Sequence, residues 1–346
     1  MGKKNNRKFY ETLSLNNESF RIWETFFRRI ALARFEWDNI PKTMNARYLE
    51  LCLYSFGKAS LLKDEERDFI NTKVTNGGNI NIYGLPTALK CFSYGYQSNR
   101  ELYVGKNEIN GNNPYREAIL VMNDFDMFPS LNNMDIYCYR LAQCDRTCDV
   151  NVNAQKTPVM VLADDKILLS VKNMASEYEG NEPFIVINKK QLDENSLRAI
   201  NTGAPIVTKE IDEHKKQIIN EALTFLGINN INIEKKERAV TDEINSNNEV
   251  VNLSMQNFLE PRLQACREFN ELFNLKVEEI SEKEYLDNYL MDKHYFIDNG
   301  RFYHDKRISV KVRSDLANII KKELSIVKDY IPDEDTTENK GGENNE

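Results

Sequence analysis

No apolar run in this sequence approaches the length that a bilayer requires. The longest runs, Ala118 to Met122 and Pro158 to Ala163, fall far short of the roughly 20 residues of a membrane-spanning helix. The basic start of the chain, residues 1–8, continues into polar sequence and lacks the apolar core of a secretory signal. We therefore expect a protein that neither spans a membrane nor is exported.

Histidine is scarce and cysteine is scattered. Cys144 and Cys148 stand four residues apart, but no histidine is near them, so buried free thiols are favoured over zinc ligands. His294 and His304 flank a predicted hairpin, where packing against aromatic neighbours is favoured over a metal pair. We expect six free thiols, no disulfide, no metal and no cofactor.

Motifs for catalysis are also missing. The sequence holds neither the G-x-x-x-x-G-K-[ST] loop that binds nucleotide phosphates nor the G-x-S-x-G turn of hydrolases. Asp124 and Asp126 would share one face of a strand and could hold Mg²⁺, but the sequence shows no third ligand. These absences predict that the protein is not an enzyme.

The charge balance of the chain is acidic. Its 346 residues include 46 Lys plus Arg and 54 Asp plus Glu, a net charge of −8. Such a surface repels phosphate, which excludes a uniformly basic protein that coats DNA. A length of 346 residues and an apolar fraction of 41% predict a globular α+β protein of two or three units.

Apolar periodicity and helix-ending residues predict several long helices. One stripe of Phe20, Trp23, Phe27 and Ile30 predicts a helix over residues 17–38, and Asn45 and Gly57 are expected to cap a second helix over 46–56. Further helices are expected over residues 132–154, 170–178, 209–226, from 254 onward with a kink at Pro261, and 314–330.

Strands are expected over residues 118–122, 159–163 and 184–187, which we assign to one small α+β module interrupted by a long helix. Residues 71–113 are rich in Gly and Asn turns that join short strands. Asn299-Gly300 between aromatic runs predicts a β-hairpin. Residues 229–250 lack apolar periodicity and predict a long mobile loop.

Two clusters of basic residues are candidates for contact with nucleic acid. Lys3, Lys4, Arg7 and Lys8 form a positive arm, although a solubilising tail explains them equally well. The second cluster, Lys235, Lys236 and Arg238, lies beside acidic residues, so a solvated loop is the simpler interpretation for one copy. In a symmetric ring, however, the same cluster would form a circle of cations.

Several segments closely resemble one known family, the portal proteins of small φ29-like short-tailed phages, also called head-tail connectors or upper collars. The segments that carry the resemblance are Phe35 to Pro41, Phe128-Pro129, Asn153 to Val159, Tyr178 to Asn181 with Pro183, Thr224 to Ile228, Ile233 to Arg238, Val240 to Glu243 and Ser246-Asn247. The resemblance covers residues 20–275 in order.

This resemblance implies a mainly helical α+β portal fold, with a tilted helical bundle as channel wall, a small β-containing narrow end and a helical wide end. The protein would form a homododecamer at one vertex of the virion, assembled in the host cytoplasm. Double-stranded genomic DNA would be packaged and ejected through it. Its implied partners are a packaging ATPase, a packaging RNA where one is used, major capsid and scaffolding proteins, and lower collar or tail proteins.

The resemblance also assigns a role to each part of the chain. Lys235, Lys236 and Arg238 would belong to a DNA-channel loop, Lys209, Lys215 and Lys216 to a channel helix, and Lys3, Lys4, Arg7 and Lys8 to the contact with packaging RNA and motor. The implied segments are a flexible arm (1–16), a wing or channel-wall segment (17–60), a short-strand region of the narrow end (61–130), a channel helix (131–156), an α+β narrow-end module (157–205), a second channel helix (206–228), the channel loop (229–250), wide-end helices with an inserted hairpin near 293–305 (251–330) and a disordered acidic tail (331–346).

Residues 281–307 look inserted relative to the family, and we expect them to enlarge the wide end. Two other interpretations stay open at this stage. The chain could be a monomeric or dimeric nucleic-acid-binding protein that uses its two basic clusters, or a lower collar or tail adaptor with ring symmetry.

Overall fold

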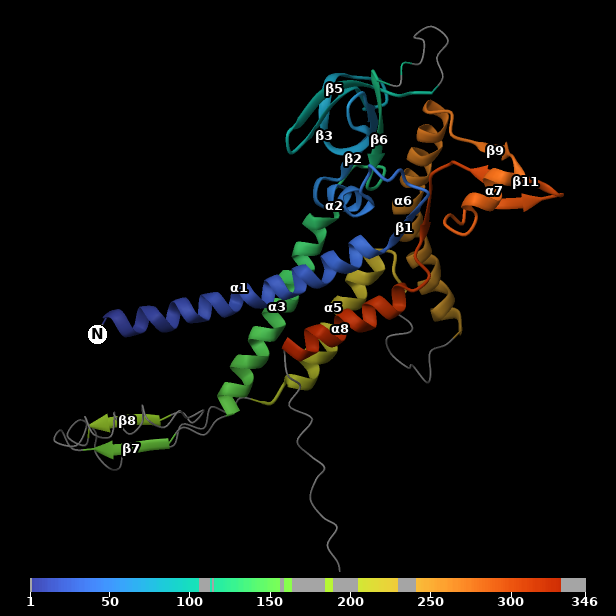
Figure 1. Ribbon diagram of the computed structural model, residues 1–346. Coiled ribbons are helices and arrows are strands. Elements are labelled where there is room, and N and C mark those ends of the chain that lie inside the picture. Colours follow the sequence, from blue (N-terminus) through green and yellow to red (C-terminus); the bar gives the residue numbers. More distant parts are fainter. Residues whose placement is uncertain are drawn as a thin grey trace, which may run out of the picture. The chain divides into compact units, whose positions relative to one another are not determined.

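The computed structural model describes residues 2–105, 113, 115–155, 159–163, 184–188, 205–229 and 241–330. The chain divides into two compact units, Met1–Phe20 with Tyr139–Ile219, and Arg21–Cys138 with Asn220–Glu346. The fold is α+β, as predicted, and its long helices are α1 (Gly2–Ala33), α3 (Ser130–Gln155), α5 (Thr208–Phe225) and α6 (Thr241–Leu272) (Figure 1). No helix in the described ranges is long and apolar enough to cross a bilayer.

Five strands of the second unit close into a barrel: β2 (Lys58–Asp64), β3 (Asp68–Ile80), β4 (Pro86–Ser93), β5 (Tyr96–Leu102) and β6 (Glu117–Met122). All neighbours are antiparallel except β5 and β6. The pair that closes the barrel sets Ala59 opposite Val121 and Leu61 opposite Ile119. Closure leaves no free strand edge, and one cluster of buried side chains within these strands comprises Leu62, Val74, Leu89, Cys91, Ala118 and Leu120.

The predicted α+β module is wrong in one respect. Residues 118–122 form a strand, but it closes the barrel instead of joining residues 159–163 and 184–187. Those two segments are β7 (Val159–Ala163) and β8 (Phe184–Asn188), which pair in parallel in a sheet of their own. A short apolar run predicts a buried strand but not its partner. The predicted helix over 170–178 lies outside the described residues.

The helix predicted over residues 17–38 ends at Ala33, and β1 (Phe35–Asp38) follows it. This strand pairs antiparallel with β12 (Ser309–Val312), with Trp37 opposite Val310. Apolar and acidic residues alternate in β1 with a period of two, as expected for a strand. This short pattern directly follows the longer helical periodicity of α1, so the sequence prediction extended the helix through it. Residues 2–16, expected as a flexible arm, are helical; no Pro or Gly after Gly2 interrupts that stretch.

The helix predicted over 46–56 is confirmed as α2 (Ala46–Phe56). The side chain of Asn45 accepts a hydrogen bond from the amide of Tyr48 at 2.9 Å, which caps its start. Gly57 ends it in the left-handed conformation at φ 76°, and a Cβ atom there would collide with the carbonyl of Met127. Only glycine meets both conditions.

Helix α6 begins inside the predicted loop 229–250, so the loop prediction is wrong for residues 241–250. These residues contain no Pro or Gly that would interrupt a helix. Pro261 lies within the helix, and the apolar face of α6 joins a core of buried side chains. That core comprises Phe35, Trp37, Met44, Leu49, Cys52, Leu53, Ala59, Leu61, Tyr103, Ile119, Val121, Phe258, Ala265, Cys266, Phe269, Leu272, Ile308 and Val310.

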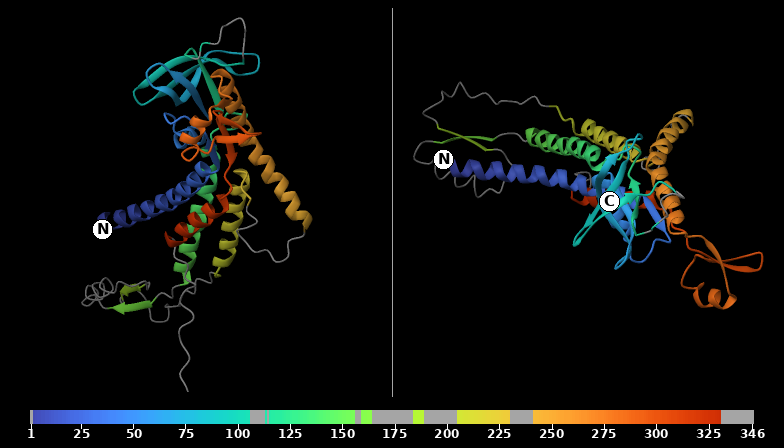
Figure 2. Two further views of the ribbon diagram at one scale, coloured as in Figure 1. Left: turned by 45° about the vertical axis from the view of Figure 1, so that its right-hand side comes forward. Right: turned by 90° about the horizontal axis from the view of Figure 1, so that it is seen from above.

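The region after α6 is richer in strands than the helical wide end we predicted for 251–330. It holds β9 (Val277–Ile280), α7 (Glu282–Asn288), β10 (Tyr295–Asp298) and β11 (Arg301–Asp305), followed by β12 and α8 (Leu316–Tyr330). The hairpin is confirmed, because Asn299 and Gly300 join β10 to β11 with φ values of 48° and 75°. We call β9, α7, β10 and β11 the strand module; both views of Figure 2 show it, in orange, apart from the barrel.

Candidate functional site

The predicted basic residues fall into three groups in the structure. Lys235, Lys236 and Arg238 lie outside the described residues. Lys3, Lys4, Arg7 and Lys8 lie in the first turns of α1, and their side chains are outside the described part. Lys209, Lys215 and Lys216 all lie on α5, and their side chains can be compared.

Lys215 is largely shielded from solvent and is paired with an acid. Its ammonium lies 2.6 Å from Oδ1 of Asp145, and both side chains are largely shielded, at 16% and 9% exposed. Ser19 donates a hydrogen bond to Oδ2 of the same carboxylate at 2.7 Å. Burial lowers the pKa of Lys215, but the charge and hydrogen bond of Asp145 outweigh it and raise the pKa above its ordinary value. Lys215 therefore joins α5 to α3, and Asp145 joins both to α1.

Lys209 and Lys216 are exposed, and they share the outer face of α5 with more acids than bases. The exposed charged residues of this helix are two cations, Lys209 and Lys216, and four acids, Glu210, Asp212, Glu213 and Glu221, which gives 2 − 4 = −2. This face is electronegative with sparse positive points. Such a surface repels a phosphate backbone overall.

A buried ion pair holds α6 against α2 and the barrel. Arg262 is fully buried; its Nε and Nη2 atoms donate to both carboxylate oxygens of Glu50 at 2.9 and 2.8 Å. Its Nη1 donates to the carbonyls of Asn123 and Phe258, at 2.9 and 2.6 Å. Trp37 donates its indole N–H to Glu50 at 2.8 Å. All charges in this group are therefore compensated, as burial requires.

A second buried arginine ties the end of α1 to the end of α5. Arg34 is 1% exposed, and its Nη1 donates to the carbonyl oxygen of Leu226 at 2.8 Å. Its guanidinium lies 4.4 Å from the ring centre of Phe258. Burial, with Arg262 nearby, lowers the pKa of Arg34 to about 9, which keeps it charged at neutral pH. A cation is favourable at a helix C-terminus, so Arg34 fixes α5 immediately before residues 229–250.

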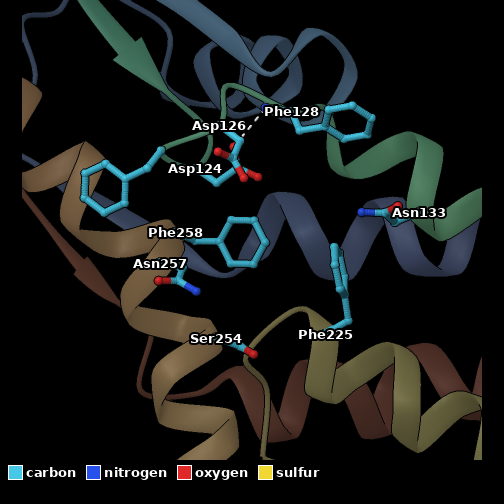
Figure 3. Close-up of a pocket in the computed structure, with 9 residues that line it drawn as sticks. Asp124, Asp126, Phe128, Asn133, Phe225, Ser254, Asn257 and Phe258 are labelled. Carbon is cyan, nitrogen blue, oxygen red and sulfur yellow. Dashed lines mark hydrogen bonds between the residues drawn. The ribbon is translucent and has the colours of Figure 1, made fainter. Parts of the chain in front are cut away.

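An open cavity of about 390 Å³ lies among the turn after β6, the end of α5 and the middle of α6. Figure 3 shows the carboxylates of Asp124 and Asp126 close together above the ring of Phe258, with Phe225 facing the same space. Asp124 accepts a hydrogen bond from the amide of Phe128 at 2.8 Å, so it stabilises the turn. The described residues contain no group of three His, Cys, Asp or Glu placed to hold a metal ion. The residues lining the cavity are Asp124, Phe125, Asp126, Phe128, Asn133, Phe225, Ser254, Asn257 and Phe258.

Sequence reasoning missed Asp145, Arg34, Glu50 and Arg262. A signal existed for Arg262, because it falls on the apolar stripe of Phe258, Cys266 and Phe269 in α6. A charged residue at a core position of a helix predicts a buried partner. Nothing local identifies Glu50 as that partner.

A model of one protein family, the phage connector (GP10), matches residues 2–285. The chain belongs to the phage connector family. The resemblance noted in the sequence is thereby confirmed, and the connector is a phage portal protein. It is a structural component of the virion that forms an oligomeric ring at the portal vertex, where it assembles with capsid and tail components.

The connector also resembles a chain of a solved structure, the portal and tail of native bacteriophage P68. The two are 13% identical, the alignment covers 84% of this chain and 96% of that chain, and the TM-score is 0.43. The family match ends at residue 285, within α7. Most of the strand module and α8 therefore lie beyond it.

Proposed function

We propose that twelve copies of this connector close into a ring at a single capsid vertex, and that genomic DNA passes through its centre during packaging and ejection. The family match over residues 2–285 carries this proposal. Residues of α1, α3 and α5 would form the tilted channel wall.

Electrostatics would let DNA move through such a ring. Twelve copies at −8 each carry 12 × −8 = −96. Duplex DNA carries one negative charge per ~1.7 Å of its axis, so it is repelled from all sides of an acidic bore and can slide. The electronegative outer face of α5 supports this reasoning. Tight binding of DNA to the bore would stop the DNA from moving.

Sparse cations would then centre or brake the DNA. We assign this role to the channel-loop residues Lys235, Lys236 and Arg238, with Lys209 and Lys216 as further positive points on α5. Lys215 is better assigned to holding the helices together, because its charge is engaged by Asp145. Arg34, which binds the end of α5, would fix the start of the channel loop.

The two ends of the ring would meet different partners. The barrel region 61–130 and residues 157–205 would form the narrow end, which docks the packaging ATPase and the lower collar and tail proteins. Lys3, Lys4, Arg7 and Lys8 would contact the motor and, where one is used, a packaging RNA. Residues 251–330 would face capsid and scaffolding proteins during assembly in the host cytoplasm.

Complementation tests the channel role. A phage lacking this protein is supplied with wild-type chain or with Lys235, Lys236 and Arg238 all changed to alanine. We expect rings and particles to form but the packaged genome to be shorter or poorly retained. A matched variant that keeps the three charges, with Lys235→Arg, Lys236→Arg and Arg238→Lys, should behave as wild type. Unchanged genome length and retention in the loop variant would contradict the proposal.

A further inference from the structure

Tyr103 and Glu117 each carry a buried polar atom that lacks a partner. Tyr103, directly after β5, is 2% exposed, and its hydroxyl has no hydrogen-bond partner among the described residues. Oε2 of Glu117, at the start of β6, is buried in the same condition. The two residues are neighbours in space, because β5 and β6 pair in parallel and the amide of Tyr103 donates to the carbonyl of Ala118 at 3.0 Å. Buried polar atoms are normally satisfied, so these two atoms point to a missing ligand.

The end of α6 brings two more carboxylates to the same place. Burial, followed by the nearby charge of Glu271, raises the pKa of Tyr103 to about 12. The charges of Glu117 and Glu268 act in the same direction, so three carboxylates lie near this hydroxyl. Glu268 and Glu271 are three positions apart on α6 and share one face of it. The C-terminal end of a helix carries partial negative charge, and the last turn of α6 contains no basic residue, so acids are poorly placed there without a cation.

The described cations in this region are paired with other acids. Arg116, at the edge of the barrel, pairs with Glu101 at 3.4 Å. Arg267, on α6, pairs with Glu260 at 2.8 Å. Both pairs are exposed to solvent, with every side chain at least 43% exposed, so they lie outside the shielded part of the cluster. The carboxylates that form no ion pair with a described lysine or arginine are those of Glu117, Glu268 and Glu271.

The surroundings disfavour the negative charges of these acids. Burial raises the pKa of Glu117, and the charge of Glu101 raises it further. Burial also raises the pKa of Glu268, although the hydrogen bond from Gln264, at 2.9 Å, and the charge of Arg267 act in the other direction. A bound cation would relieve this penalty, because an opposite charge nearby favours the ionised carboxylate.

We propose that these three carboxylates and the hydroxyl of Tyr103 form a binding site for an organic cation, one that carries an ammonium or guanidinium group. A metal ion does not fit the cluster, because no group of three His, Cys, Asp or Glu in the described part of the chain is placed to hold one. Ammonium and guanidinium groups have several N–H donors, and an alkyl chain lets them reach oxygens that lie further apart. The cation comes either free from solution or as a basic side chain of another copy in the ring.

Calorimetric titration of the assembled protein with agmatine, which carries one guanidinium and one ammonium group, tests the site at constant ionic strength. We expect one agmatine per chain with a Kd of about 1 mM or tighter. Glu117→Gln and Glu271→Gln should each weaken binding about tenfold, because each removes a charged acceptor. Tyr103→Phe should weaken it roughly threefold, the effect of one neutral hydrogen bond. Glu282→Gln, at an exposed position on α7, removes the same charge elsewhere and should bind as wild type.

The same variants separate the two sources of the cation. Binding of agmatine by wild-type rings shows that the site takes a free cation. If another copy supplies the cation, wild-type rings bind no agmatine, and the double variant Glu117→Gln with Glu271→Gln needs about tenfold more protein to assemble. No agmatine binding together with unchanged assembly of the double variant overturns the proposal. Lys106 lies outside the described residues, and binding by Lys106→Ala protein alone would also overturn it, because the chain would then fill the site itself.

Discussion

Arg262 and Glu50 are 212 positions apart in sequence, yet they form a two-point ion pair at 2.9 and 2.8 Å with neither side chain more than 4% exposed. The pair fixes the position of α6 on α2. Arg262 also donates to the carbonyl of Phe258, a residue that lines the cavity of Figure 3.

Arg262→Met should therefore strongly destabilise the protein. It leaves Glu50 and the carbonyl of Asn123 buried without their partner, a loss of about 3–5 kcal/mol for a broken buried pair. Arg267→Met on the same helix is the matched control, because its pair with Glu260 is exposed and should cost less than about 1 kcal/mol. Thermal unfolding of both variants measures the difference. Equal effects would show that the buried pair has no special role.

Lys215→Met should loosen the contacts among α1, α3 and α5. The pKa of Lys215 is raised in the folded protein, so its contribution is fully present below its ordinary value of 10.5 and is lost only as the pH rises beyond it. We expect a loss of about 2 kcal/mol that is constant from pH 6 to about 9.5. Exchange protection of α5 is the readout, and Lys209→Met, exposed on the same helix, should have little effect.

Glu268→Gln should stabilise the protein at neutral pH. Burial raises the pKa of Glu268, so its ionised form is disfavoured in the folded state, and this penalty grows as the pH rises through the folded pKa. Glutamine removes the charge and still accepts the bond from Gln264. Stability should rise by about 1 kcal/mol or less at pH 7 and be unchanged near pH 3. A gain of equal size at both pH values would contradict this explanation.

Gly57→Ala should strongly destabilise the junction between α2 and the barrel. The residue has φ 76°, and an added Cβ would meet the backbone of Met127 and Phe128. Gly84 has a similar φ of 78° but open space around it. Gly84→Ala should cost only the backbone strain, about 1–2 kcal/mol, whereas Gly57→Ala should cost clearly more. Denaturant unfolding compares the two, and equal costs would show that the close approach is unimportant.

Local signals in the sequence predicted the elements better than their partners. Asn45 and Gly57 fixed both ends of α2, and Asn299-Gly300 fixed the hairpin, because caps and tight turns depend on adjacent residues. Phe35 to Asp38 was assigned to a helix because its partner, Ser309 to Val312, lies far along the chain. The barrel was missed as a closed unit for the same reason.

The candidate site shows the same limit, because the sequence identifies residues but not their distant partners. The family resemblance assigned Lys209, Lys215 and Lys216 to a channel helix, but it could not separate the shielded member from the two exposed ones. The pairing of Lys215 with Asp145 depends on how α3 and α5 pack, and a spacing of 70 residues leaves no local trace of it. Asn299-Gly300 predicted the hairpin that follows His294, whereas the contact of its Nε2 with Oδ1 of Asp38, at 3.0 Å, depends on the folded chain.

Electron microscopy of the purified protein shows whether copies of this chain close into a ring. We expect closed rings of about twelve copies, the number the family resemblance implies, with a stain-filled hole wide enough for one DNA duplex. Particles of single or paired chains at every concentration, or closed particles without a central opening, would contradict it.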